Sequence, residues 1–456
     1  ITNGIIKNKI FLIKIILIIY AILSNFIEDF KNLILISLLI TTIIFWATSV
    51  IPNYQTSLIF LFTCLGFSLS SKEIIFSGFA SSAFWLVLAG MLIATAIKNV
   101  NLSQRFSVFF TNIINPSYLK ILITIDIFSL LFSFVMPSSL GRVVLLIPIA
   151  IIVAKNFGFQ ETDKGYIGIM LTFILATVIP AFAILPSNVP NMILAGLTNE
   201  IYGIELLYSH YLLANFFILG FIKNFLIVVL IYFFYKDTPK ILPTKAQKTD
   251  FSKDEKIVIL VTSLMLFFWT TDFIHHISTS IIAIVGVLIL ANPMINIIKT
   301  KDINNLNFAS LLLVATIIAL GNIVSNDSYI KELLTTTLNS FEPSQSKVLN
   351  YTGISSLMAF CAIFTTQPSV PAVFTPMAQQ LSVLSNFNLN DIFMMEVSAF
   401  STIFFPFQSP PLIVGLTLAN IKQIKVLKIL FILSLISIFL LFPLQYYWLE
   451  FIKIFF

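Results

Sequence analysis

Four apolar segments of the chain are each interrupted by proline together with small hydroxyl or amide side chains. The interruptions are FVMPSSLGRVV at 134–144, LPSNVPNMI at 185–193, FTTQPSVPAVF at 364–374 and FPFQSPPLI at 405–413. Because proline breaks a helix, each interruption leaves helix ends inside an apolar segment. A helix N-terminus attracts anions, whereas freed backbone carbonyls suit Na+ or a proton-bearing partner. The pattern therefore indicates reversible binding of an anion and a coupling cation.

The polar and small residues at these interruptions are the candidate ligands. We expect substrate contacts from Ser138, Ser139, Gly141, Arg142, Asn188, Asn191, Thr366, Gln367, Ser369, Gln408 and Ser409, and Ser187 and Thr365 are of the same kind. Within this set, Ser139, Asn188, Gln367 and Ser409 form a candidate Na+ neighbourhood. A single interruption of this type is more simply explained as a kink in a packed helix. Four interruptions in a symmetric arrangement favour a binding site.

Two basic residues lie within apolar segments, where a charge is costly and is a candidate for function. The planar guanidinium of Arg142 matches a carboxylate in two-point contact, and an ion pair with Asp126 is the alternative. Lys223 lies in LGFIKNFLIVV, and we expect it to form a structural ion pair with Asp126 or Glu396. Proton coupling through Lys223 or the two acids is the alternative, although acids near span ends more often cap helices or remain solvated.

The composition places these residues in a membrane protein. Of the 456 residues, 58% are apolar and only 10% are charged, against about 25% in soluble proteins. This composition excludes a soluble enzyme, because too few polar side chains are present to cover a water-facing surface. It also speaks against a nucleic-acid binder, because the lysines lie between apolar runs and form no basic patch. The chain has no Walker A, GxSxG or HExxH motif, so we expect no enzymatic activity and no cofactor apart from Na+ or H+ as coupling ion.

Apolar runs predict an all-α integral membrane protein with about eleven spans. The runs lie at 10–24, 33–50, 56–69, 80–98, 165–197, 211–235, 257–273, 278–298, 307–325, 391–420 and 429–449. The first run has no typical cleavage site after it, and we interpret it as a retained helix. Regions 121–154 and 348–384 are divided near their middles, and an arm of about a dozen residues rises ~18 Å, less than the ~30 Å hydrocarbon core. We therefore expect two re-entrant hairpins.

The basic residues orient these spans. With the N-terminus in the cytoplasm, most lysines fall in cytoplasmic loops, including the polar segment 236–256, and the C-terminus lies outside. This arrangement predicts a multi-pass protein of the cell membrane. It also makes the first hairpin enter from the cytoplasmic side and the second from the outer side.

The two halves of the chain have the same order of elements. FWLVLAGMLIATAIKNVNLS at 84–103 is similar to FASLLLVATIIALGNIVSND at 308–327, and each is followed by a hairpin and a broken helix. Since the two segments run in opposite directions, we expect an inverted-topology repeat. The predicted parts are 1–79 as N-terminal scaffold, 80–235 as first repeat, 236–256 as cytoplasmic linker and 257–456 as second repeat. The broken helices are 165–197 and 391–420.

These residues resemble the divalent anion/sodium symporter family of the ion transporter superfamily. AFWLVLAGMLIATAIKNVNL at 83–102 is similar to the helix before the family's first hairpin, whose tip carries Ser-Asn-Thr with a proline ten positions after the Ser. Pro148 then assigns the first tip to Ser138, Ser139 and Leu140, and Pro376 assigns the second to Thr366, Gln367 and Pro368. The segments 187–191 and 409–412 are similar to the family's Thr-Pro-Pro-Asn stretch.

The resemblance implies several properties. The Asn of a family tip helps to hold Na+ and the Thr meets a substrate carboxylate, whereas Leu140 and Pro368 here have no hydrogen-bonding side chain. A subgroup of carboxylate exchangers carries an Arg four residues after the tip Ser, the position of Arg142. The resemblance further implies a homodimer with an elevator-like motion.

The sequence thus predicts a secondary active transporter of small organic anions, di- or tricarboxylates, that works by cation-coupled symport or anion exchange. A Na+/H+ antiporter or a permease for sulfate or arsenite-type oxyanions is the alternative within the superfamily. Those cargoes favour intramembrane carboxylates, which the tips lack. A membrane-embedded enzyme would need clustered acids or histidines at one membrane face, and a channel would not need two hairpins of opposite entry.

Overall fold

Every regular element in the described part of the chain is a helix, as the sequence predicts. The computed structural model describes residues 16–25, 27–48, 51–100, 117–240, 250–330, 344–364 and 366–453, with the single positions 14, 102 and 332. No strand occurs within these ranges. Residues 10–13 and 15 of the first predicted span, 241–249 of the predicted linker and the candidate Thr365 lie outside them.

The helices of the first half run up to the polar segment in the middle of the chain. They are α2 (Phe30–Thr48), α3 (Asn53–Gly66), α4 (Lys72–Ala80), α5 (Ser82–Asn99), α7 (Tyr118–Val135), α8 (Ser139–Asn156), α9 (Lys164–Val178), α10 (Val189–Tyr202), α11 (Tyr208–Asn215) and α12 (Lys223–Tyr235). Two short 3-10 turns, η1 (Pro180–Ala183) and η2 (Leu185–Ser187), join α9 to α10, and a π-helical turn, η3 (Phe216–Ile222), joins α11 to α12.

The second half contains the corresponding series. Its helices are α13 (Lys253–Thr270), α14 (Asp272–His275), α15 (Thr279–Ala291), α16 (Thr300–Asn304), α17 (Phe308–Asn326), α19 (Lys347–Cys361), α20 (Ser369–Phe374), α21 (Ala378–Ser385), α22 (Leu389–Phe400), α23 (Pro410–Leu418), α24 (Ile424–Ile436) and α25 (Phe442–Ile452). The 3-10 turns η4 (Ala362–Phe364), η5 (Thr375–Met377) and η6 (Pro406–Gln408) and the π turn η7 (Ser437–Leu441) lie between them.

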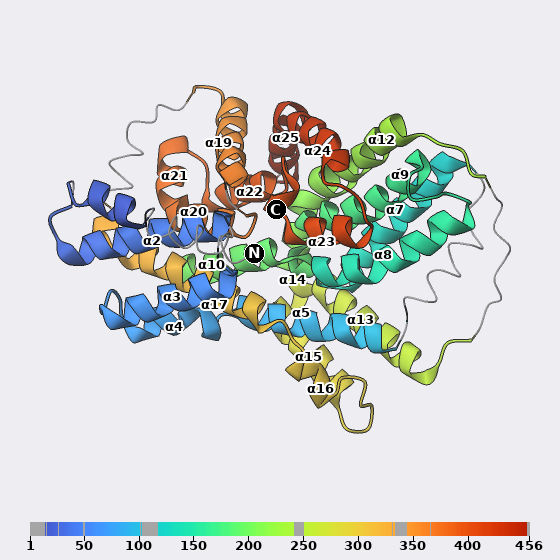
Figure 1. Ribbon diagram of the computed structural model, residues 1–456. Helices are drawn as coiled ribbons and strands as arrows, with labels where there is room; N and C mark the ends of the chain where they lie inside the picture. The colour runs from blue at the N-terminus through green and yellow to red at the C-terminus, as the bar shows by residue number, and fades with distance from the viewer. Residues whose placement is uncertain are drawn as a thin grey trace.

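The two halves exchange their packing partners. Helix α3 packs on α17 while its counterpart α15 packs on α5, and the hairpin helix α8 packs on α23 while α20 packs on α10. Figure 1 shows the hairpins α7–α8 and α19–α21 on opposite sides of the molecule, with α10, α22 and α23 between them. Such an exchange is expected of two repeats that are related by a two-fold axis. The packing brings the broken helix of each half against the hairpin of the other.

Seven described segments are long and apolar enough to cross a membrane; five of them correspond to spans among the eleven predicted, and the other two are the arms of the predicted first hairpin. They are Lys72–Asn99, Tyr118–Val135, Ser139–Asn156, Lys164–Ala183, Tyr208–Tyr235, Phe308–Asn326 and Ile424–Ile452. Phe30–Trp46 and Thr279–Ala291 are apolar but shorter. The counts differ partly because the run 391–420, which is counted as one span although a break is predicted within it, is divided into short helices in the structure. The chain is a multi-pass membrane protein.

The arms of the first hairpin are longer than predicted. Helices α7 and α8 have 18 residues each, against the predicted dozen or so, and 18 residues rise about 27 Å. The short-arm prediction was wrong here because Pro148 lies inside α8 without ending it and because α7 begins at Tyr118. In the second hairpin α19 has 15 residues, and the returning arm is divided at η5.

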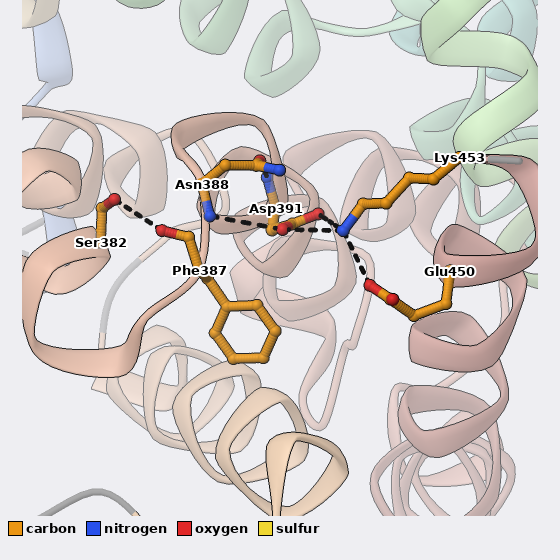
Figure 2. A network of polar contacts seen from close by, with 6 residues as sticks. All are labelled: Ser382, Phe387, Asn388, Asp391, Glu450 and Lys453. Carbon is orange, nitrogen blue, oxygen red and sulfur yellow. Dashed lines mark hydrogen bonds and ion pairs between the residues drawn. The ribbon is translucent and has the colours of Figure 1, made fainter. Parts of the chain in front are cut away.

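The start of α22 is held by a polar network (Figure 2). The side chain of Asn388 accepts a hydrogen bond from the Asp391 backbone N–H at 2.8 Å, and Asp391 accepts from the backbone of Asn388 in return. Lys453, just after α25, forms ion pairs with Asp391 at 2.9 Å and Glu450 at 2.8 Å. Burial alone would lower the pKa of Lys453, but its hydrogen bonds to Glu450 and Asp391 outweigh burial and raise that pKa. The network ties the first half of a broken helix to the end of the chain's last long helix.

We expect Asn388→Ala to lower the free energy of unfolding by about 1 kcal/mol, because an N-cap without a side-chain acceptor leaves a backbone N–H of the first turn unpaired. Thermal unfolding of the detergent-solubilised protein measures this loss. The control is Asn390→Ala, an exposed position two residues later within the same helix, which we expect to change stability little. Equal melting temperatures for the two variants would contradict a capping role for Asn388.

Candidate functional site

The four interruptions meet around one cavity of about 260 Å³. Its lining contains Pro137–Leu140 from the first hairpin tip, Gln367 and Pro368 from the second, and residues 188–190 and 409–411 from the broken helices. Val87 and Met91 of α5 complete the wall together with Asn307, Ser310 and Leu313 at the start of α17, and Val178 and Phe182 beside the first break. The convergence expected from the sequence is therefore present, and α10, α22 and α23 provide it from the middle of the fold (Figure 1).

The cavity gathers about half of the candidate residues. Ser138, Ser139, Asn188, Gln367 and Ser409 line it, and these include the whole candidate Na+ neighbourhood. Six further candidates, Gly141, Arg142, Asn191, Thr366, Ser369 and Gln408, are not among its lining residues. All four predicted segments contribute to the lining, but the sequence pattern did not distinguish residues that line the cavity from residues that do not.

Two of the residues behind the cavity hold the broken helices in their unwound form. The amide of Asn191 donates to the carbonyls of Ala181 and Ile184 at 3.0 and 2.8 Å. At the other break the Gln408 amide donates to the Ala362 carbonyl at 2.8 Å, and its Oε1 accepts from the backbone N–H groups of Phe404 and Phe405. Each amide thus replaces helical hydrogen bonds that the interruption removes. Thr366 and Ser369 form a hydroxyl pair at 3.3 Å.

Two hydrogen-bonding atoms at the cavity have no partner among the described residues. The amide nitrogen Nδ2 of Asn188 is unpaired, although Oδ1 of the same residue caps α10 by accepting from the Asn191 N–H at 3.0 Å. The hydroxyl of Ser409 is also unpaired. Both residues are nearly inaccessible, at 5% and 1% exposure. They hold equivalent positions, because each is the last residue before the second half of a broken helix. A buried donor without a partner is costly, so this pair is suited to a ligand with acceptor oxygens.

The helix N-termini at the cavity offer fewer N–H donors than the sequence pattern suggested. Pro190 is in the first turn of α10, and Pro410 and Pro411 open α23. Proline has no N–H group, so these ends contribute chiefly the partial positive charge of the helix dipole. At α8 the Ser138 side chain accepts from the Gly141 N–H at 3.2 Å. Side-chain donors therefore carry more of the directional recognition than backbone donors do.

Arg142 is fully buried and is held by oxygen atoms of the first hairpin and the first broken helix. Its Nη1 donates to the Met136 carbonyl and to Ser187 Oγ, and its Nη2 donates to Ser139 Oγ at 3.0 Å and to the carbonyls of Thr177 and Ser187 at 3.2 Å. The ion pairs of the described residues do not include Arg142. The alternative of an Arg142–Asp126 pair is wrong, and the guanidinium places a fixed positive charge directly behind Ser139.

Lys223 is a second buried cation and lies at the second break. Its Nζ donates to the Ser401 carbonyl at 2.8 Å and to the hydroxyls of Ser401 and Thr402. The predicted ion pair with Asp126 or Glu396 is therefore wrong, since Asp126 accepts from Asn224 at 2.7 Å and Glu396 accepts from Thr375 at 2.7 Å. Each broken helix thus has one buried basic side chain bound to the oxygens of its interruption.

The cavity lining contains residues that the sequence offered no means of selecting. Asn53 at the start of α3 and Asn307 and Ser310 at the start of α17 belong to ordinary helix ends. A larger cavity of about 610 Å³ adjoins the first and shares Met91, Ser138, Leu140 and Asn307 with it, and this second cavity reaches Lys98 at the end of α5. Neither lining contains a carboxylate, so both suit an anion.

Comparisons with known proteins agree with this geometry. A family model described as the sodium:sulfate symporter transmembrane region matches residues 5–454. A protein of Cupriavidus necator, described as a membrane protein, is 23% identical over 299 residues, which cover 59% of this chain and 56% of that protein. The chain therefore spans little more than half the length of this relative, whose description names no substrate.

Proposed function

Because this chain belongs to the sodium:sulfate symporter transmembrane family, we propose that it is a secondary active transporter that carries small organic anions, di- or tricarboxylates, across the cell membrane. The observation that supports this most directly is the pair of unpartnered groups, Asn188 Nδ2 and Ser409 Oγ, at equivalent positions of the two halves. Both face a cavity whose lining has no carboxylate. Arg142, directly behind Ser139, and Lys223, at the second break, are basic side chains that form no ion pair with a described carboxylate.

A carboxylate fits the cavity better than an inorganic ion does. The walls include Val87, Met91, Val178 and Phe182, and a hydrocarbon skeleton between charged ends would cover these apolar side chains. The volume of about 260 Å³ lies close to the lower end of the roughly 300–1,000 Å³ that small-molecule sites occupy. Sulfate is the second candidate, because the matching family is described by that ion. It would leave most of the apolar wall without contact.

The positions of Arg142 and Lys223 bear on the coupling ion. Carbonyl and hydroxyl oxygens at helix breaks are typical ligands of Na+ in transporters. Here the oxygens of Ser139, Ser187 and Ser401 already bind a guanidinium or an ammonium group. We therefore propose transport that does not require Na+, in which fixed cations offset the charge of the substrate.

The remaining parts of the sequence-based prediction complete the proposal. We propose two re-entrant hairpins within an inverted repeat with the boundaries given above, a cytoplasmic N-terminus, an outer C-terminus, and a homodimer with an elevator-like motion. In this orientation Lys98 lies at the cytoplasmic end of α5, and the larger cavity beside it would be the path between the cytoplasm and the site. The structure would then represent a state open toward the inside.

Counterflow in proteoliposomes tests this function. Vesicles loaded with unlabelled succinate, citrate or sulfate are diluted into the same radiolabelled anion, with Na+ or with choline as the only monovalent cation. We expect uptake of a carboxylate in both media and weaker or no uptake of sulfate. Uptake of sulfate alone would support sulfate, the second candidate, as the substrate. A strict requirement for Na+ would contradict the role given to Arg142 and Lys223. No uptake of any of the three anions would refute the proposal.

A further inference from the structure

Glu396 is a fully buried acid that the proposed binding site does not use. It lies on α22 with an exposed fraction of 0%. Its Oε2 accepts a hydrogen bond from the Thr375 hydroxyl at 2.7 Å, and its Oε1 has no partner in the part of the chain that the structure describes. No ion pair of the described residues includes Glu396. An isolated ionised carboxylate is very costly in such surroundings, and protonation of the carboxyl group removes that cost.

The groups around Glu396 supply no compensating cation. The helices packed against α22 carry Glu200 and Tyr202 on α10, Tyr208, His210 and Tyr211 on α11, and Lys347 and Tyr351 on α19. Glu200, His210 and Lys347 are exposed. On α22 itself, Asp391 is paired with Lys453 at the start of the helix. Lys223, a buried basic residue of α12, is bound at Ser401 and Thr402, which follow the end of α22.

The position of Glu396 links it to the second hairpin and to both broken helices. It lies four residues before Phe400, about 6 Å of helical rise, and the Phe400 carbonyl accepts from the Gln367 amide of the second tip at 2.9 Å. Thr375, which donates the hydrogen bond to Glu396, is at the break in the returning arm of that hairpin. Tyr202 at the end of α10 donates to the Thr375 carbonyl at 2.8 Å. A shift of the second hairpin against α22 would therefore separate Thr375 from Glu396.

We propose that Glu396 is the binding site of a coupling proton, which the carboxyl group takes up on one side of the membrane and releases on the other as the second hairpin opens and closes beside the substrate cavity. The step is protonation and deprotonation of one carboxylate with no other bond change. This inference rests on the proposed anion transport and specifies H+ as its coupling ion. With Arg142 and Lys223 in place of mobile cations, a proton is the cation left to drive accumulation.

Asp126 provides the matched comparison. It is also buried, accepts one hydrogen bond, and leaves Oδ1 unpartnered. It lies on α7, nine residues before the end of that helix at Val135, and its partner Asn224 belongs to α12 and not to a hairpin tip or a break. Asp126 therefore shares the chemistry of Glu396, but its hydrogen bond joins an arm of the first hairpin to α12 and does not involve the second hairpin.

The experiment measures radiolabelled succinate in proteoliposomes under two conditions. Without a pH gradient, counterflow reports the transport cycle alone. With an acidic exterior, one pH unit corresponds to about tenfold accumulation per coupled proton. We expect the wild type and Asp126→Asn to show both activities, and Glu396→Gln to keep counterflow while losing accumulation driven by the gradient. A pH-sensitive dye inside the vesicles should report proton entry with succinate in the first two proteins only.

Several outcomes would overturn this inference. The inference fails if Glu396→Gln accumulates as much succinate as the wild type, or if Asp126→Asn alone loses accumulation. It also fails if the wild type shows counterflow but a pH gradient does not drive its uptake. Each of these results leaves the proposed anion transport standing. Absence of counterflow in the wild type would refute both the proposed anion transport and the proton site.

A second variant applies if Glu396→Gln does not fold. Thr375→Val removes only the hydroxyl donor, and we expect the pH of half-maximal uptake to shift by about half a unit or more. An unchanged pH profile would refute the role of Glu396.

Discussion

Replacement of Asn188 by aspartate should reduce anion transport at least about a hundredfold. The two side chains have nearly the same shape, and the remaining Oδ1 can still cap α10 through the Asn191 N–H. The change removes the unpartnered Nδ2 donor and adds a negative charge to a cavity that has none in its lining. Two like charges 4 Å apart repel by about 4 kcal/mol at an effective dielectric constant of ~20, roughly a thousandfold in affinity. Initial rates of succinate counterflow over a range of concentrations measure the loss.

The control for this prediction is Asn199→Asp. Asn199 lies on the same helix, is exposed, and contributes to a separate pocket of about 190 Å³ that includes Ser82 and Ser280. Asn199→Asp makes the same change of charge eleven residues after Asn188. We expect transport within about twofold of the wild type, because exposed charges are screened by solvent and salt. Equal effects of the two substitutions, or normal transport by Asn188→Asp, would exclude Asn188 from the substrate site.

Replacement of Arg142 by lysine should weaken transport at least about tenfold while most of the protein remains folded. Lysine keeps the positive charge but has three donors at one point, whereas the guanidinium reaches five acceptors on Met136, Ser139, Thr177 and Ser187. At least two buried acceptors lose their donor, at about 1–3 kcal/mol each. The Ser139 hydroxyl is then no longer fixed at the cavity wall. Counterflow measures the transport loss, and size-exclusion elution with thermal unfolding reports the folded fraction.

Arg142→Gln separates the charge from the hydrogen bonds. It keeps two donors but removes the positive charge, so we expect a larger transport defect than in Arg142→Lys. If the oxygens released by Arg142 then accept a mobile cation, addition of Na+ should restore part of the transport. Normal transport by both variants would mean that Arg142 neither positions Ser139 nor supplies charge to the site, and the proposal of a fixed cation at the first break would fail.

The location of the helix breaks could be predicted from the sequence because it depends on local chemistry. Proline ends helices regardless of its neighbours, so LPSNVPNMI and FPFQSPPLI are breaks in the structure as they are in the sequence. The membrane character follows from composition in the same way. The length of the hairpin arms did not follow, because Pro148 is accommodated inside α8, and the number of long spans fell below the prediction partly because some runs are split into short helices.

The partners of the buried charges show the limit of sequence reasoning. Simple pairing of opposite charges suggests Asp126 or Glu396 for Lys223, yet Lys223 binds carbonyl and hydroxyl oxygens of Ser401 and Thr402. Such oxygens become available only because α22 ends there and its last carbonyls have no helical donor. The preference of the ammonium group for them depends on how two distant segments pack.

The sequence by itself determined that this chain is helical, embedded in a bilayer, and interrupted at four places by residues able to bind ions, since these properties depend on side-chain hydrophobicity and on the missing N–H of proline. Only the tertiary structure decided that the four places share one cavity, that Asn188 and Ser409 face it with unpartnered groups, and that Arg142 stands behind it. The reason is geometric: the direction of a side chain at a helix break depends on the long-range packing that closes around it.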